Sequence, residues 1–368
     1  MSWQDAIVKH IGPGGLSGCT LAEWLRMLSR NRFAVDLRYW PRAAAITLHC
    51  ALNSFWSHVE NRRYAARVKE TSVPPPLFIL GVWRSGTTHL HNLLCQDDRF
   101  AWPNTYQAFF PHTFLCTEEW NARTLQRFMP STRPMDNVRN GVEMPQEDEF
   151  AMAASGFSFL IGSMTFPRTD QYFRRFLSLR DATPEEIDAW KSCLMRFLQK
   201  LTFKYDRPLV LKSPAHTSRI RLLLELFPDA KFVNIHRHPH AVFQSSVHTA
   251  KKAMPYWTLQ AHEQSVDQTF KDSAEIFDAF FEQRHLIPPE NFCEIAYEQL
   301  DQNPIEQLRH VYETLDLPDF NFVEPRIRDY TLSLKGYRKN SFPELSNDIR
   351  ERLAREWSRC FEEWGYPT

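Results

Sequence analysis

Neither sign of charge is in excess in this sequence of 368 residues, in which Lys and Arg together number 44 and Asp and Glu together number 44. A balanced chain has no overall field to draw it onto nucleic acid or an anionic bilayer. Nucleic acid is therefore excluded as a partner, and any site for an anion must be local. With only 11 glycines and 43% hydrophobic side chains, the chain is long enough to bury one substantial core.

Cysteine patterns and long apolar runs are also missing. The seven cysteines form no C-x-x-C pair, and no Asn-x-Ser/Thr sequon occurs, which excludes a secreted protein built on disulfides and predicts a cytoplasmic location. The longest apolar-leaning stretch, residues 43–56, is interrupted by His49 and Asn53. It is too short and too polar to span a bilayer, and the N-terminus lacks the pattern of a signal peptide.

The first part of the chain, residues 1–73, is predicted to be a helical extension packed on the core. Within it, residues 42–69 form one amphipathic helix, because apolar side chains recur at spacings of three and four. These side chains are Ala45, Leu48, Leu52, Phe55 and Val59. Packing of this stripe on the core is the favoured interpretation, and contact with a membrane surface or a partner is the alternative.

From residue 74 onward, short apolar strands alternate with helix signals. Strands are predicted over residues 77–82, 208–212, 231–236 and 292–297. Helix starts follow them at Ser213-Pro214, Pro239 and Pro304. Strand, crossover helix and strand imply parallel pairing.

We therefore predict an α/β fold over residues 74–368, in which three layers are arranged around a central parallel sheet and the first strand feeds a P-loop-like turn. Residues 98–205 are aromatic-rich and are expected to form a helical insertion over the active site. A last helix, closed by Gly365, is predicted from the shared face of Ile349, Leu353, Trp357, Phe361 and Trp364.

The stretch FILGVWRSGTTH, residues 78–89, has the form of a phosphate loop that lacks its lysine. Gly81 and Gly86 lie five positions apart, and Thr87 occupies the place of the lysine of a nucleoside triphosphatase. The cation is instead Arg84, which offers a fixed fork of donors. Since ligands bind at the carboxyl ends of parallel strands, next to helix N-termini, this loop is a candidate anion site. Its donors are Arg84, Ser85, Gly86, Thr87 and Thr88.

Two further strand ends carry suitable residues. Lys212 closes the strand at 208–212 and can reach a phosphate or sulfate oxygen, and His216 is placed to act as a general base. The alternatives are a surface lysine and a histidine on a helix face. Arg237 follows the strand at 231–236, and Ser245 lies eight positions later in the next helix, so both can contact one phosphate.

In order and spacing, these motifs resemble the sulfotransferases that use 3′-phosphoadenosine 5′-phosphosulfate (PAPS). Arg84 to Thr88 match the family's loop for the 5′-phosphosulfate, and Arg237 with Ser245 match its element for the 3′-phosphate. Lys212 matches its strand-end lysine, with His216 near it. The arginine at position 84 places the chain closer to the bacterial, carbohydrate and tyrosyl-protein branches than to the cytosolic steroid and phenol enzymes, whose adenine-stacking Trp is here His89.

Two later motifs extend the resemblance. The family's Tyr-Glu-Asp-Leu element before Asn-Pro is matched by Tyr297 and the residues after it, and the resemblance places this tyrosine at the nucleotide. The pair Arg338 and Lys339 resembles the family's late basic element at the 3′-phosphate.

The resemblance implies metal-independent, in-line transfer of a sulfuryl group to an acceptor hydroxyl, which leaves a sulfate ester and adenosine 3′,5′-bisphosphate (PAP). Arg84 and Lys212 would neutralise the charge that develops on the donor. The proton acceptor is either His216 or Glu147, which belongs to an acidic run that could equally be a helix start. A lipid-like alcohol is the preferred acceptor, because aromatic residues make up 14% of the chain, although a large core accounts for them equally well. No feature indicates an oligomeric state.

Three alternatives remain at this stage. A small-molecule or nucleoside kinase would use the same loop with magnesium, but its lysine is absent. A metal enzyme would use His236, His238 and His240, although Pro239 interrupts that strand. A non-catalytic module would bind a nucleotide or a membrane and would tolerate the loss of Lys212 and His216.

Overall fold

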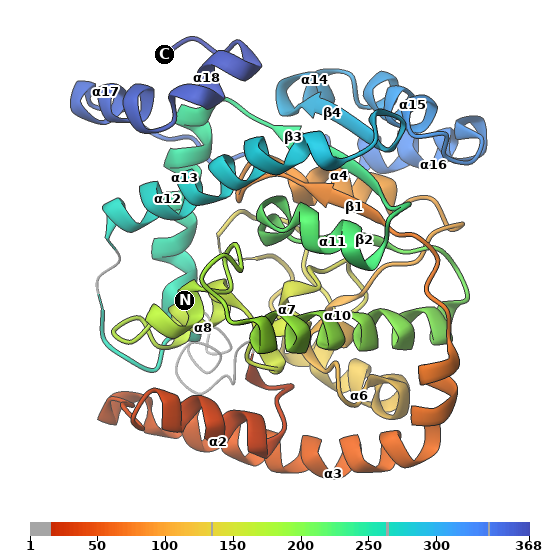
Figure 1. The fold of residues 1–368 in the computed structure, drawn as a ribbon, viewed down its shortest axis with the longest axis vertical. Helices are drawn as coiled ribbons and strands as arrows, with labels where there is room; N and C mark the ends of the chain where they lie inside the picture. Colours follow the sequence, from red (N-terminus) through yellow and green to blue (C-terminus); the bar gives the residue numbers. More distant parts are fainter. Residues whose placement is uncertain (1–15, 134, 263–264, 338) are drawn as a thin grey trace. The chain divides into compact units, whose positions relative to one another are not determined.

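Figure 1 shows the computed structural model, which describes residues 16–133, 135–262, 265–337 and 339–368. Contacts divide the chain into two compact units. The first, called the helical unit, takes residues 1–73, 103–206 and 251–264, and the second, called the sheet unit, takes residues 74–102, 207–250 and 265–368. The expected N-terminal extension and most of the expected insertion at 98–205 thus share one unit.

The sheet unit contains a four-stranded parallel sheet of order β2-β1-β3-β4 within the described residues. Its strands are β1 (Leu77–Leu80), β2 (Val210–Lys212), β3 (Lys231–His236) and β4 (Phe292–Ala296). All three pairings are parallel, with Ile79 level with Lys212 and His236 level with Ala296. The predicted α/β class, the four strands and their parallel direction are confirmed.

The helix starts predicted at Pro239 and Pro304 are confirmed, whereas the start predicted at Ser213-Pro214 is wrong, because a 3₁₀ turn, Pro214–Ser218, comes first and the helix begins only at Ile220. The helices that follow the strands are α4 (Thr87–Leu94), α11 (Ile220–Leu226), α12 (Pro239–Trp257, which continues into the helical unit), α13 (Val266–Gln283), α14 (Tyr297–Gln302), α15 (Pro304–Thr314) and α16 (Phe320–Ser333). On one face of the sheet, Ile79 and Val233 share a buried cluster with residues of α4, α15 and α16. On the other face, Phe78 contacts the rings of Phe227 and Phe232.

The last helix is predicted as one element but is broken in two, α17 (Asn347–Glu356) and α18 (Ser358–Trp364). The break is at Trp357, which leaves helical geometry with φ −117° and ψ 26°. Its buried indole contacts the ring of Phe277 and donates to the Phe270 carbonyl at 3.3 Å. Burial of this large side chain against α13 therefore interrupts the helix. Gly365 adopts the left-handed conformation expected of a closing residue.

The helical unit is built around a second buried cluster, which includes Trp24, Ile46 and Phe166. A capping box of Thr20 and Glu23 begins its first described helix. Its α-helices are α2 (Leu21–Arg30), α3 (Trp40–Glu70), α5 (Thr105–Phe109), α6 (Phe114–Phe128), α7 (Glu149–Ala154), α8 (Phe159–Thr165), α9 (Gln171–Arg174) and α10 (Pro184–Tyr205).

The long helix α3 exists as predicted, but the predicted packing of its apolar stripe on the core is wrong. Leu48, Leu52 and Phe55 are 62%, 55% and 62% exposed. The buried side is largely polar instead, and it includes Arg42, Asn53, Ser57 and Glu60 together with Ile46, Cys50 and Val68. Arg42 donates to the Thr258 carbonyl at 2.8 Å. Periodicity alone cannot show this, because the partners of the polar side come from segments far away in the sequence.

Among the described residues, no helix is both long enough and apolar enough to cross a membrane. All seven cysteines are free.

Candidate active site

The loop between β1 and α4 turns sharply around three residues with positive φ. These are Gly81 at 138°, Arg84 at 74° and Gly86 at 108°. A side chain at Gly81 would place its Cβ 2.5 Å from the carbonyl oxygen of Ile235, so only glycine allows the loop to lie this close to β3. The hydroxyl of Ser85 donates to the Val82 carbonyl at 2.9 Å and holds the turn from inside.

Two of the predicted anion sites meet in the structure. The Nε of Arg84, in the loop, donates to the hydroxyl of Ser245, in α12, at 2.9 Å. The guanidinium of Arg237, which follows β3, donates to the backbone carbonyl of Arg84 at 3.3 Å. The structure thus brings the predicted elements for the 5′-phosphosulfate and the 3′-phosphate into direct contact.

Tyr297 lies beside these cations because of the register of the sheet. His236 is level with Ala296, so the residues that follow them, Arg237 and Tyr297, are neighbours. The Arg237 guanidinium carbon lies 4.4 Å from the centroid of the Tyr297 ring. The Lys339 ammonium lies 5.4 Å from the same centroid.

Lys339 also forms an ion pair with Asp301. This places one member of the predicted late basic pair beside Tyr297. Arg338, the other member, lies outside the described residues.

Lys212 lies at the end of β2 and is 2% exposed. Its ammonium donates to the hydroxyl of Thr88 in the first turn of α4, at 3.4 Å. Thr87, next to it in that turn, is 4% exposed. The predicted strand-end lysine and the predicted loop are therefore adjacent.

The two candidate bases differ in their surroundings. His216 is fully buried in a 3₁₀ turn, Pro214–Ser218, where its ring meets Phe78 edge-on at 5.3 Å. Because side chains alternate along a strand, Phe78 faces away from the side of the sheet that carries Ile79 and Lys212. The structure thus does not bring His216 together with Lys212. Glu147 belongs to the helical unit, where it is half-buried just before α7.

Sequence reasoning did not single out Thr217, which supports the loop. Its hydroxyl accepts a hydrogen bond from the Gly81 backbone N–H at 2.7 Å. The only signal for it in the sequence is a hydroxyl residue soon after a strand end. His89, in the first turn of α4, is half-buried, and burial lowers the pKa of its imidazole while Asp301 partly opposes the shift.

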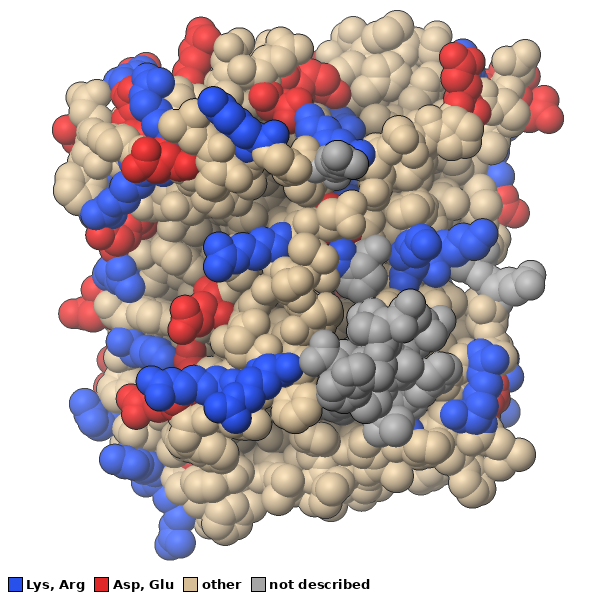
Figure 2. Space-filling view, turned by 180° about the vertical axis from the view of Figure 1, so that it is seen from behind, with Lys and Arg blue, Asp and Glu red and all other residues tan. Residues whose placement is uncertain are grey.

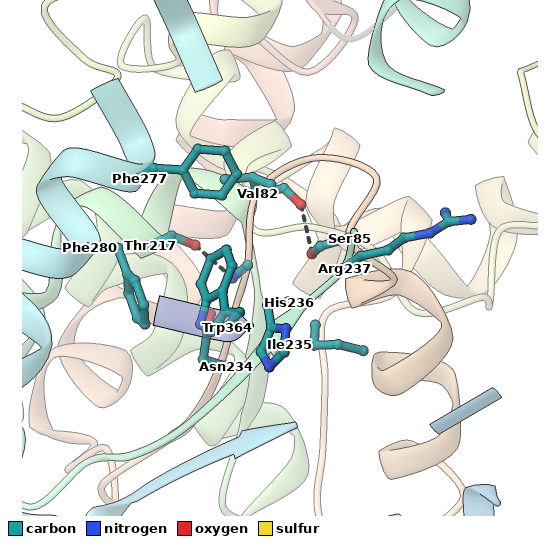
Figure 3. Close-up of a pocket in the computed structure, with 11 residues that line it drawn as sticks. Val82, Ser85, Thr217, Asn234, Ile235, His236, Arg237, Phe277, Phe280 and Trp364 are labelled. Carbon is teal, nitrogen blue, oxygen red and sulfur yellow. Dashed lines mark hydrogen bonds between the residues drawn. The ribbon is translucent and has the colours of Figure 1, made fainter. Parts of the chain in front are cut away.

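Figure 3 shows a small cavity behind the loop, between the ends of β1 and β3 and the aromatic side chains of α13 and α18. Its volume of about 10 Å³ holds roughly one water molecule. In the same view the side chain of Arg237 points away from this space. A nucleotide does not fit in a cavity of this size.

In the described residues, no group of three or more His, Cys, Asp and Glu side chains is placed to hold a metal ion. The three histidines of the metal alternative have other partners. His236 stacks on Trp364 with a centroid distance of 4.8 Å and an interplanar angle of 4°. His238 contacts the ring of Tyr366, and His240 contacts the ring of Phe361.

Gly86→Ala is expected to weaken PAP binding by about tenfold or more while costing about 1–2 kcal/mol of stability. The residue has φ 108°, and an added Cβ would lie 2.4 Å from Cδ2 of Tyr297. Tyr297 must move, and Arg237 packs on its ring. Calorimetric titration and chemical denaturation would measure the two effects. Gly336→Ala is the matched control, since it meets nothing within 4 Å, and equal binding by both variants would contradict the prediction.

The fold is expected to lose stability as pH falls from about 6.5 to about 4. Burial lowers the pKa of His236 to about 4, with Glu298 partly opposing the shift. Between these pH values the imidazole of His236 is protonated in the unfolded chain but not in the folded chain. The free energy of unfolding therefore falls by about 3 kcal/mol across this window. Denaturation at a series of pH values should show a flatter profile for His236→Phe than for the wild type. The exposed His285→Gln should keep the wild-type profile, and a His236→Phe profile as steep as the wild type's would count against this account.

Comparison with known proteins gives a consistent picture. A family model described as the sulfotransferase family matches residues 75–321. The omega-hydroxy-beta-dihydromenaquinone-9 sulfotransferase Stf3 of Mycobacterium bovis is 36% identical over 352 residues, which cover 95% of this chain and 90% of that protein. The Mycobacterium tuberculosis protein of the same name matches to the same extent.

Solved structures agree on the fold. The sulfotransferase STF9 from Mycobacterium avium has a TM-score of 0.71 at 20% identity, covering 94% of this chain and 96% of that chain. The sulfotransferase STF1 from Mycobacterium tuberculosis has a TM-score of 0.65 at 17% identity, covering 91% and 92%.

The predicted resemblance, including its leaning toward bacterial members, is confirmed by these matches, and so is sulfuryl transfer as the reaction. The kinase alternative is not favoured, since Thr87 replaces its lysine and the relatives are sulfotransferases. The chain belongs to the sulfotransferase family.

Proposed function

We propose that this enzyme transfers the sulfuryl group of PAPS to the hydroxyl of a lipid-like acceptor. The observation that carries the proposal is the convergence of Arg84, Arg237, Ser245 and Tyr297 at the carboxyl edge of the sheet. These residues offer cations and a hydroxyl to two separate anionic groups, as an adenosine bisphosphate requires. A contiguous triphosphate would instead require a lysine at position 87.

The residues take distinct roles under this proposal. When bound, PAPS supplies a sulfuryl group whose leaving group is a phosphate. The backbone N–H groups around Gly86 and the hydroxyls of Ser85, Thr87 and Thr88 hold the 5′ end at the start of α4. Arg84 and the buried Lys212 neutralise negative charge at that end, where the reaction increases it. Arg237 and Ser245, with Lys339 and Arg338, bind the 3′-phosphate, and Tyr297 contacts the nucleotide.

The proposed acceptor is a hydroxylated, isoprenoid-like lipid. Support comes from the name of the 36% identical relatives, which act on an omega-hydroxylated dihydromenaquinone. The helical unit adds a group of half-buried aromatic rings, Phe109, Phe150 and Trp257, with centroids 4.9 to 6.2 Å apart. Phe150 also donates its backbone N–H to the carbonyl of Glu147 at 3.3 Å. An apolar wall of this kind suits the body of a lipid.

The proton acceptor stays assigned to Glu147 or His216. A general base must reach the acceptor hydroxyl, and the full burial of His216 against Phe78 makes Glu147 the better candidate. Glu147→Gln removes the base and keeps the size of the side chain. If Glu147 is the base, kcat of this variant falls by about 10²–10⁴-fold, whereas His216→Gln mainly lowers stability.

A transfer assay tests the proposed function. Labelled PAPS is incubated with the wild-type chain and a hydroxylated isoprenoid quinone, a simple phenol or a sugar. Sulfation of the quinone well above the other two supports the lipid-like acceptor. Sulfation of the phenol or the sugar instead would support PAPS as the donor but contradict the proposed acceptor class. Absence of transfer to every acceptor tried, together with no binding of PAP, would contradict the whole proposal.

A further inference from the structure

The outer face of α3 is apolar in a helix whose buried side is largely polar. This outer face is defined by Leu48, Leu52 and Phe55, with the half-buried Val59 one turn further along. Their spacing of four, three and four residues places them on one line along the helix. We infer that the outer face of α3 docks this protein on the surface of a membrane that contains anionic lipids.

Leu48, Leu52 and Phe55 contribute little to the core, because each is more than half exposed. Removing them from water requires another surface. A stripe of large apolar side chains along several helical turns is unusual on a monomeric soluble protein and marks an interaction site. The polar side of α3 is the one that the fold uses, through contacts such as Arg42 with Thr258 and Glu60 with Lys200. The packing of the helical unit therefore requires the polar side of α3 to face inward and leaves its apolar side exposed.

Exposed indole rings frame the stripe. Trp40, at the start of α3, is 59% exposed, and Trp120 of α6 is 53% exposed. Trp120 contacts Trp56 of α3 with a centroid distance of 5.6 Å. Tryptophan prefers the boundary between lipid chains and water, since its ring is apolar and its N–H is polar. This composition suits a bilayer interface.

The exposed charges of this region are almost all positive. Over residues 21–70 the exposed ionic side chains include one carboxylate, Glu70, and the following cations: Arg26, Arg30, Arg32, Arg38, Arg62, Arg63, Arg67 and Lys69. The lower edge of Figure 2, over α2 and α3, is mostly tan, with blue and little red at its left corner. The chain as a whole is neutral, so this local excess of cations complements an anionic lipid surface.

Charge also favours a membrane over a second copy of this chain. A symmetric dimer through the outer face of α3 would bring two cationic surfaces together, since exposed arginines lie at both ends of the stripe, Arg38 before it and Arg62 after it. Anionic lipid neutralises them instead, while the leucines and the phenylalanine enter the headgroup boundary. The biological use of this docking rests on the proposed lipid-like acceptor, which a membrane would hold, but the binding itself does not depend on the reaction.

Vesicle sedimentation with the full chain tests the inference. Vesicles are phosphatidylcholine alone or phosphatidylcholine with phosphatidylglycerol. The wild type should sediment with the anionic vesicles and much less with the neutral ones. The triple variant Leu48→Ser, Leu52→Ser, Phe55→Ser should lower partitioning by about tenfold or more. The matched control is Phe322→Ser with Leu332→Ser, since these side chains of α16 are 51% and 54% exposed, and its partitioning should stay within about twofold of the wild type.

A charge variant, Arg62→Gln, Arg63→Gln, Arg67→Gln, should lose the preference for anionic vesicles while keeping PAP binding, which shows that the fold is intact. Three results would overturn the inference: no sedimentation of the wild type, equal loss in the triple variant and the α16 control, or a wild-type dimer that the triple variant dissociates without any vesicle binding. Vesicle binding that persists in a chain with no transfer activity would separate failure of the proposed function from failure of this inference.

Discussion

Lys212→Ala is expected to lower kcat by about 10²- to 10³-fold. Lys212 is 2% exposed and contacts Thr88 in the first turn of α4. A buried cation interacts strongly with negative charge that develops beside it, because little water is present to screen the interaction. Since this charge grows as the sulfuryl group leaves, the loss should fall on kcat more than on the affinity for PAP.

Steady-state kinetics with PAPS, together with calorimetric titration of PAP, would measure the two quantities. Lys271→Ala is the control, because Lys271 is an exposed lysine of α13 in the same unit, and its kinetics should match the wild type. A Lys212→Ala enzyme with unchanged kcat and a strongly weakened affinity would contradict this assignment. It would make Lys212 a residue that binds the ground state only.

Glu60→Leu is expected to lower the free energy of unfolding by about 3–5 kcal/mol, the largest effect on stability. Glu60 and Lys200 form a buried ion pair in the helical unit, with side chains 3% and 6% exposed. Burial raises the pKa of the Glu60 carboxyl and lowers the pKa of the Lys200 ammonium, so each charge depends on the other. The Glu60 carboxylate also accepts the Cys116 N–H at 3.2 Å, and the Lys200 ammonium lies 4.5 Å from the centroid of the Phe114 ring.

Chemical denaturation of single and double variants separates the pair from its surroundings. Glu60→Leu leaves an unpaired buried cation, whereas Glu60→Leu with Lys200→Met removes both charges and should recover much of the lost stability. The matched comparison is the more exposed pair of Lys204 and Glu118, whose lysine is 31% exposed; Lys204→Met should cost about 1 kcal/mol or less. A double variant as unstable as the sum of its single variants would show that the two charges do not interact.

The parallel sheet and the loop were predictable because their signals are local. A run of apolar residues followed by a glycine turn or a proline marks each strand and the helix start after it, and these signals do not depend on the rest of the chain. Parallel pairing followed from the crossover connections. The hydrogen bond between Arg84 and Ser245 could not be predicted from local signals, because it depends on the positions of β1 and α12 in the folded unit.

The failures of prediction arise where tertiary contacts outweigh a periodic pattern. The stripe of α3 has the spacing of a core helix, yet the core takes Arg42 and Glu60, whose partners Thr258 and Lys200 are far away in the sequence. The last helix has one continuous apolar face, yet packing of Trp357 against α13 breaks it.

The central claim is that the loop and Arg237 form a site for an adenosine bisphosphate that needs no metal. The most direct test is a calorimetric and thermal-shift titration with PAP and with ATP, each with and without magnesium. The proteins are the wild type, Arg237→Ala and the control Arg221→Ala, an exposed arginine of α11. The account predicts tight, magnesium-independent binding of PAP to the wild type and to Arg221→Ala, weakened by about 100-fold in Arg237→Ala through loss of a charge-assisted contact. Binding of ATP only with magnesium, and no binding of PAP, would contradict it.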